Sequence, residues 1–170
     1  PSGEILIGEV MHLLRLSNGP VPSLYNLWAE KFGISFEETE KNPSAIIEQY
    51  NLTGGELLRR VRSESRAFIT VIAENGFTEE AVTAAMNLPE TAEGPAEWQE
   101  KIKSLATYVI EEIYPRLAKT TDELEHTLAA LSGKYIPPGP SGSPSAGGVD
   151  LLPSGRNFYG VDPRALPSQA

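Results

Sequence analysis

The stretch "TGGELLRRVRSESRAFITVIAENG", residues 53–76, decides the fold. Its apolar residues recur three and four positions apart, which places them on one face of an α-helix. These residues are Leu57, Leu58, Val61, Phe68, Ile69 and Ile72. Thr53 and Glu56 have the spacing of a capping box at the start of a helix. Asn75 and Gly76 are suited to its end, because glycine readily adopts the left-handed cap conformation. The stretch therefore predicts a long amphipathic helix.

The segments that precede this stretch also predict helices. The apolar residues of "GEILIGEVMHLLRL" form a wide helical face, and the proline- and glycine-rich "SNGPVPS" ends it. A second helix is expected from Ser23 to Gly33. "SFEE", which begins at Ser35, repeats the capping-box pattern. Asn42 followed by Pro43 suits the N-cap and first turn of another helix.

The segments after residue 76 continue the helical pattern. Thr78 is suited to cap "TEEAVTAAM", and Pro115 must end or kink the long helix that follows. The apolar residues of that helix are Trp98, Ile102, Leu105, Val109 and Ile113. "TDELEHTLAALSG" predicts a last helix, which ends at Gly133. No segment alternates as a strand does, so residues 1–133 are predicted to form a mainly α domain, a helical bundle.

The composition changes at Lys134. Seven of the 14 prolines lie in the last 37 residues, together with many glycines and serines. The net charge is +1 in this part and −10 in residues 1–133. Residues 134–170 are therefore predicted to be an extended, largely irregular Pro/Gly-rich segment, packed on the helices or on other parts of a longer parent chain.

Composition and charge exclude several classes of protein. The chain has 170 residues, of which 40% are hydrophobic and 22% are charged, as in a globular protein. Its net charge of −9 argues against binding to nucleic acid or to an anionic membrane surface. The absence of cysteine excludes disulfides and thiolate metal sites. No apolar run approaches the roughly 20 residues of a membrane-spanning helix, and there is no signal-peptide pattern. Because the chain does not begin with Met, we expect it to be a fragment of a longer protein.

Both histidines occur in a Glu-x-x-His pattern, which places the two side chains on one helix face. The pairs are Glu9 with His12 and Glu123 with His126. Two such pairs, facing each other with two more glutamates, would form a di-metal carboxylate site in a helical bundle. The alternative is that all four side chains are solvated or act as caps.

The sequence contains no nucleotide-binding motif. The pattern G-x-x-x-x-G-K-[ST] is absent, and "NLTGGELL" lacks the lysine that contacts phosphates. The basic run of Arg59, Arg60 and Arg62 is short and is followed by Glu64, so we interpret it as a solvated helix face.

The segment "RNFYGVDPRALP", residues 156–167, differs from an ordinary linker. Phe158 and Tyr159 favour burial, Gly160 suits a turn, and Asp162 with Pro163 starts one. A stiff loop that carries Arg, Asn, Tyr and Asp is how a rigid ligand-binding loop could be built. "PPGP", in contrast, fits a linker or a polyproline ligand.

Two parts of the C-terminal segment resemble the signature of the large subunit of aerobic cobaltochelatase. They are "GPSGSP", residues 139–144, and "LPSGRNFYGVDPRALPS", residues 152–168. The related magnesium chelatase large subunit shares a looser version. "TTDELEHTLAALSGKYIPPG" and "HLLRLSNGPVPSL" are also similar to the family. The chain departs from the family pattern at Ala146, where the family has arginine, at Ser154, where it has threonine, and at Gly160, where it has serine.

The resemblance implies a cytoplasmic enzyme of cobalamin biosynthesis, a metal chelatase of the ligase type. The parent chain would bind a corrin, hydrogenobyrinic acid a,c-diamide, and insert Co2+ into it. ATP and Mg2+ would act through separate AAA+ ATPase subunits, and this fragment alone is expected to bind no cofactor and to be inactive. The alternative is a non-catalytic helical docking domain for partner subunits.

Within this resemblance, five residues of the motif are candidates for the site. Arg156 and Asn157 are suited to donate to the carboxylates and amides of the macrocycle. Tyr159 could stack on the ring, and Ser154 keeps the family hydroxyl. Asp162 could hold the metal or accept a proton as the catalytic residue.

Each of these candidates has a structural alternative. Asp162 could cap the turn before Pro163, Phe158 could lie in the core, and Arg156 could pair with a helix carboxylate. His126 is a candidate metal ligand because it is the imidazole nearest the motif, but it could equally be structural.

Overall fold

The computed structural model describes residues 3–15, 21–119 and 132. The chain divides into two compact units, Pro1–Tyr114 and Pro115–Ala170. Almost all described residues belong to the first unit, which is helical apart from one small two-stranded sheet. The mainly α fold predicted from the sequence is therefore confirmed for this part of the chain, while a domain boundary at residues 133 and 134 stays a prediction.

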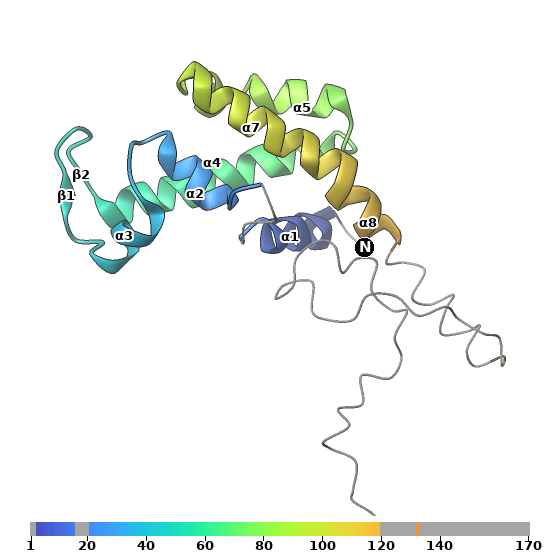
Figure 1. Cartoon of the computed structure of the whole chain (residues 1–170), viewed down its shortest axis with the longest axis horizontal. Helices are drawn as coiled ribbons and strands as arrows, with labels where there is room; N and C mark the ends of the chain where they lie inside the picture. Colours follow the sequence, from blue (N-terminus) through green and yellow to red (C-terminus); the bar gives the residue numbers. More distant parts are fainter. Residues whose placement is uncertain (1–2, 16–20, 120–131, 133–170) are drawn as a thin grey trace, which may run out of the picture. The chain divides into compact units, whose positions relative to one another are not determined.

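The first unit is organised around α4 (Gly54–Glu74), which packs against α1, α2, α3 and α5 (Figure 1). The predicted capping box is present: the Glu56 N–H donates to the Thr53 hydroxyl over 3.3 Å, and the Thr53 N–H donates to the Glu56 carboxylate over 2.8 Å. The helix ends at Asn75 and Gly76, whose φ is 77°. All six apolar residues predicted for its inner face are buried. This confirms both the bounds and the buried face of the predicted helix.

Three shorter helices precede α4: α1 (Gly3–Leu13), α2 (Leu24–Glu30) and α3 (Phe36–Lys41). Ser23 and Ser35 are the N-caps of α2 and α3, as their positions in the sequence predict. Asn42 was predicted to begin a helix, and this was wrong, because it is the C-cap of α3. The loop after it folds back on the start of α4: Gly54 N–H donates to the Ala45 carbonyl and Gly55 N–H to the Pro43 carbonyl, both over 2.8 Å.

Two short strands that the sequence did not predict lie in this loop. β1 (Ile46–Ile47) pairs antiparallel with β2 (Leu52–Thr53). Each strand has two residues, so no alternation of polar and apolar residues can develop along it. The hairpin leads the chain from α3 directly into the cap of α4.

The second half of the unit contains α5 (Glu79–Met86), α6 (Pro89–Ala92) and α7 (Ala96–Tyr108). Thr78 caps α5, as predicted. After α7 come η1 (Val109–Ile113), which is π-helical, and α8 (Tyr114–Ala118). The Tyr114 N–H donates to the Val109 carbonyl, five residues back, just before Pro115, which has no N–H to donate. Pro115 thus follows a local change of helix type, and the helical backbone continues beyond it.

Three aromatic residues from three helices meet in the core of the unit. The Trp28 ring lies 5.5 Å from the Phe68 ring and 5.1 Å from the Trp98 ring, and it meets the Trp98 ring edge to face. The Trp98 indole N–H donates to the Leu27 carbonyl over 2.7 Å. These contacts join α2, α4 and α7, so the position of α2 is fixed from both sides. Among the described residues, no helix is both long enough and apolar enough to span a membrane.

Candidate functional site

The site residues predicted from the C-terminal motif lie outside the described residues. They are Ser154, Arg156, Asn157, Tyr159 and Asp162, with His126 as the candidate metal ligand. Ala146 and Gly160, two of the departures from the family pattern, lie outside as well. The roles of all these residues therefore stay predictions.

The Glu-x-x-His pair of α1 is described, and both side chains, Glu9 and His12, are exposed. The second pair, Glu123 and His126, lies outside the described residues. Within residues 3–15 and 21–119, no three His, Asp or Glu side chains are grouped so that they could hold a metal ion. The di-metal alternative thus gains no support from the described residues.

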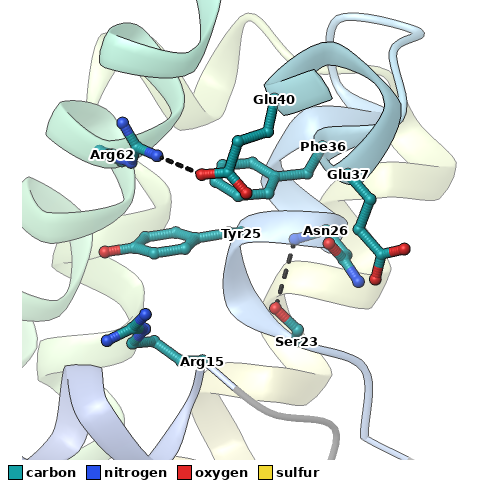
Figure 2. Close-up of a pocket in the computed structure, with 8 residues that line it drawn as sticks. All are labelled: Arg15, Ser23, Tyr25, Asn26, Phe36, Glu37, Glu40 and Arg62. Carbon is teal, nitrogen blue, oxygen red and sulfur yellow. Dashed lines mark hydrogen bonds and ion pairs between the residues drawn. The ribbon is translucent and has the colours of Figure 1, made fainter. Parts of the chain in front are cut away.

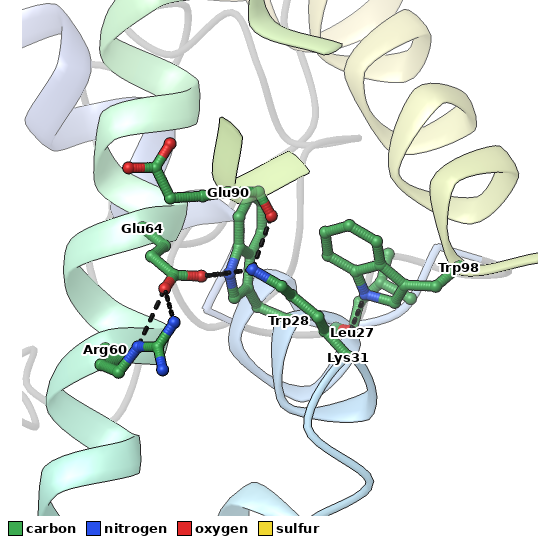
Figure 3. Close-up of polar contacts among 7 residues, drawn as sticks. All are labelled: Leu27, Trp28, Lys31, Arg60, Glu64, Glu90 and Trp98. Carbon is green, nitrogen blue, oxygen red and sulfur yellow. Dashed lines mark hydrogen bonds and ion pairs between the residues drawn. The ribbon is translucent and has the colours of Figure 1, made fainter. Parts of the chain in front are cut away.

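The buried carboxylate of Glu64 accepts four hydrogen bonds from three side chains (Figure 3). Its Oε2 accepts from the Trp28 indole N–H over 3.0 Å and from Lys31 Nζ over 2.8 Å. Its Oε1 accepts from Arg60 Nε over 3.1 Å and from Arg60 Nη2 over 2.9 Å. Lys31 also donates to the Glu90 carbonyl of α6. We call these five residues the Glu64 cluster.

The charge of Glu64 is held in place by its neighbours. Burial by itself would raise the pKa of Glu64, but the hydrogen bonds from Lys31, Trp28 and Arg60 outweigh it, and the pKa lies below its ordinary value. The carboxylate is therefore ionised at neutral pH, with both oxygens fully engaged. Because no lone pair is left for a substrate or a metal, the cluster is structural and clamps α2 and α6 to α4.

Sequence reasoning missed this cluster. The run of Arg59, Arg60 and Arg62 was interpreted as a solvated helix face, and Glu64 was noted only as the residue that follows it. Glu64 is in fact buried, with only 10% of its side chain exposed. All three arginines are exposed, as predicted, and Arg60 also bonds the buried Glu64 carboxylate. Lys31 lies 33 positions away in the sequence, so no local pattern could have identified it as the partner of Glu64.

A surface pocket of about 330 Å³ lies where α2, α3 and α4 meet the end of α1 (Figure 2). Its lining residues are Arg15, Ser23, Tyr25, Asn26, Phe36, Glu37, Glu40 and Arg62. The Tyr25 and Phe36 rings are stacked, with centroids 5.3 Å apart. In Figure 2, Tyr25 lies between Arg15 and Arg62. The pocket thus combines an aromatic wall with two guanidinium groups.

The two arginines of the pocket differ in how they are held. Arg62 donates to Glu40 over 2.8 Å and lies over the Phe36 ring, 5.4 Å from its centroid. The Arg15 side chain forms no hydrogen bond or ion pair within the described part of the chain. Since guanidinium groups bind carboxylates through paired N–H groups, the pocket can hold an acidic group of a ligand or partner.

Known proteins resemble this chain over its whole length or over parts of it. The family model for CobN/Magnesium Chelatase matches residues 1–170. The aerobic cobaltochelatase subunit CobN of Pseudomonas aeruginosa is 45% identical over 75 residues, which are 44% of this chain and 6% of that protein. The CobN subunit of a Sinorhizobium species is 54% identical over 48 residues, which are 28% of this chain and 4% of that protein.

A longer match is found to a magnesium-chelatase subunit. The chloroplastic ChlH of Oryza sativa subsp. indica is 29% identical over 165 residues, which are 87% of this chain and 11% of that protein. The chain thus spans only about a tenth or less of the length of these curated relatives. No solved structure matches the chain significantly.

Proposed function

Because the chain belongs to the CobN/magnesium chelatase family, we propose that it is part of the large subunit of an ATP-dependent cobaltochelatase. The parent protein binds a corrin precursor, hydrogenobyrinic acid a,c-diamide, and inserts Co2+ into it during cobalamin biosynthesis in the cytoplasm. The observation that carries this proposal is the family match over all 170 residues, which includes the C-terminal motif. The higher identity to the two CobN subunits than to ChlH favours cobalt over magnesium.

In this proposal the C-terminal motif recognises the macrocycle. Arg156 and Asn157 donate hydrogen bonds to its peripheral carboxylates and amides, and the Ser154 hydroxyl adds a further donor. Tyr159 stacks on the ring, which is large and apolar. These roles use residues that are identical to the family pattern except at Ser154, where the hydroxyl is kept.

Insertion of the metal needs two further groups. The hydrated Co2+ requires oxygen or nitrogen ligands while it sheds water, and the pyrrolic protons must pass to a base. Asp162 is the candidate for both roles, and His126 is a second candidate ligand. ATP hydrolysis is supplied by separate AAA+ subunits, so neither ATP nor Mg2+ binds this part of the chain.

Titration calorimetry of the 170-residue chain with hydrogenobyrinic acid a,c-diamide tests the proposal. Calorimetry suits the chain because both tryptophans are buried, with 0% and 3% of their surface exposed, and are poor reporters of ligand contact. Arg156→Ala is expected to weaken binding about tenfold or more, since it removes a charge-assisted hydrogen bond. Arg164→Ala is the matched control, because Arg164 falls at a position where the family pattern accepts any residue.

Three results would count against this proposal. Equal affinities for Arg156→Ala and Arg164→Ala would show that the motif arginine does not contact the ring. Tighter binding of a planar porphyrin dicarboxylate than of the corrin would move the chain to the magnesium branch of its family. Cobalt insertion by the chain alone, without ATPase subunits, would contradict the proposed division of labour.

A second candidate function is a helical docking domain for partner subunits. The observation that favours it is the exposed arginine-lined pocket of the first unit, which lies on helices rather than in the motif. The two functions can coexist in one large subunit.

A further inference from the structure

Four arginines form one basic surface on the first unit, which we call the arginine face: Arg15, Arg59, Arg62 and Arg66. Three of them lie on α4 at intervals of three and four residues, which places them on the same side of the helix. Arg62 lines the pocket together with Arg15 (Figure 2), so the α4 row runs past this pocket. All four side chains are exposed.

The arginine face is positively charged, although the chain as a whole is acidic. The chain carries a net charge of −9, yet four of its 14 basic residues gather on this one surface. The side chains of Arg15, Arg59 and Arg66 form no hydrogen bond or ion pair with another residue in the described ranges. Arg62 keeps 46% of its side chain exposed while it contacts Glu40. The face therefore presents guanidinium groups with free N–H donors.

The acids beside the face occupy few of these donors. The carboxylate of Glu56, three residues before Arg59, accepts hydrogen bonds from Thr53 in the capping box and interacts with Arg59 only electrostatically, without a hydrogen bond to it. Glu37 lines the pocket and forms no hydrogen bond or ion pair with an arginine in the described part of the chain, and Glu40 accepts one N–H of Arg62. Arg60, the remaining arginine of the run, is bonded to the buried Glu64.

We propose that the arginine face docks an acidic segment of a partner protein. Arg59 and Arg66 are seven residues apart, which is about 10 Å along the helix. Carboxylates at intervals of three and four residues on a partner helix span the same distance and can each meet one guanidinium. Tyr25, between Arg15 and Arg62, supplies the aromatic contact that often anchors such interfaces.

The charge of the surroundings favours a short acidic segment over a phosphate polymer. Nucleic acids and anionic membranes present negative charge over long distances, and the acidic remainder of this chain repels it. A single acidic segment is short enough to contact the four arginines, with Glu37 and Glu40 as the acids of the adjoining pocket. The inference does not depend on the proposed chelation, because it uses no residue of the C-terminal motif.

The test is a fluorescence-anisotropy titration of the 170-residue chain with a labelled peptide about 15 residues long. The peptide carries glutamates three and four positions apart on an alanine background, and a second peptide carries glutamine in their place. We expect the glutamate peptide to bind and the glutamine peptide not to bind. Raising the salt from about 0.05 M to about 0.3 M should weaken the binding several-fold.

Substitutions then locate the binding. The double variant R59Q/R66Q removes two arginines whose side chains form no hydrogen bond or ion pair within the described residues, and it should weaken binding about tenfold or more. The control K103Q/K119Q makes the same change in net charge at exposed Lys103 of α7 and at exposed Lys119, which follows α8, and it should bind within about twofold of the unchanged chain. Thermal unfolding of all three chains verifies that they are folded.

Four outcomes would overturn the proposal. The unchanged chain could fail to bind the glutamate peptide, or it could bind the glutamine peptide as well. The two double variants could lose the same affinity, which would make the effect one of net charge. Tighter binding to duplex DNA or to vesicles of anionic phospholipid than to the peptide would reassign the arginine face to phosphate groups.

Discussion

Both charged sides of α4 carry arginines, but the arginines of one side are part of the fold and those of the other are exposed. On one side Arg60 and Glu64 belong to a buried cluster with Lys31, in which both carboxylate oxygens are fully bonded. On the other side Arg59 and Arg66 are exposed, and their side chains form no hydrogen bond or ion pair within the described residues. One side therefore stabilises the fold, and the other is available for binding.

The difference between the two sides comes from the helices packed around α4. Glu64 faces α2, which supplies Trp28 and Lys31, whereas the arginine face is bordered by short α3 and the end of α1. A charge becomes structural where a second helix removes its water and supplies a counter-charge. Where no helix covers it, a charge costs little and contributes little to stability.

The largest expected effect comes from removing the lysine of the Glu64 cluster. Lys31→Met keeps the aliphatic chain but leaves the buried carboxylate without its ammonium partner, with only 8% of the lysine and 10% of the glutamate side chain exposed. We expect the free energy of unfolding to fall by about 3 kcal/mol. Urea unfolding of the variant measures it.

A double variant and a control sharpen this result. Lys31→Met combined with Glu64→Met removes both charges and should recover at least about 1 kcal/mol of the loss. Lys103→Met, at an exposed position of α7, should change stability by less than about 0.5 kcal/mol. If Lys31→Met were no more costly than Lys103→Met, Glu64 would not depend on its buried partner.

The next effect separates two arginines that are equally exposed. Arg60 and Arg62 have 47% and 46% of their side chains exposed, but Arg60 bonds a buried glutamate and Arg62 bonds Glu40, which is 57% exposed. Arg60→Gln should cost about 1–2 kcal/mol, because a buried acceptor loses its donors. Arg62→Gln should cost less than about 0.5 kcal/mol, as exposed ion pairs usually do. Urea unfolding of the two variants compares them directly, and equal costs would contradict the distinction between the two sides.

Local patterns explain which parts of this fold could be predicted. The periodic apolar residues of α4 and its capping box lie within one stretch of sequence, and both were predicted with their bounds. The caps Ser23, Ser35 and Thr78 were also identified, because a cap is a property of adjacent residues.

Features that depend on distant residues could not be predicted. Asn42 is suited to either end of a helix. It ends α3 because the loop that follows Asn42 is bonded to the backbone N–H groups of Gly54 and Gly55 instead of continuing as a helix. The burial of Glu64 depends on Lys31, which belongs to another helix. The motif residues of the candidate site were identified through the resemblance to a family, and the described residues do not include them.

The smallest effect is the dependence of the Glu64 cluster on pH. The pKa of Glu64 is below its ordinary value of 4.5, because Lys31, Trp28 and Arg60 stabilise the ionised form more than burial disfavours it. The stability that Glu64 contributes is therefore fully present above about pH 4.5 and is lost as the pH falls through the lowered pKa. Protonation keeps the shape of the side chain, so the loss should be smaller than that of Lys31→Met.

Urea unfolding of the unchanged chain and of Glu64→Gln between about pH 2.5 and pH 6 isolates this contribution. All other carboxylates are common to the two proteins, so the difference between their stabilities reports Glu64 alone. We expect the unchanged chain to be the more stable at pH 6 and the difference to shrink as the pH falls. If the difference in free energy of unfolding stayed constant over this range, the cluster would hold Glu64 by shape and hydrogen bonds rather than by its charge. The charge of Glu64 would then not distinguish the two sides of α4.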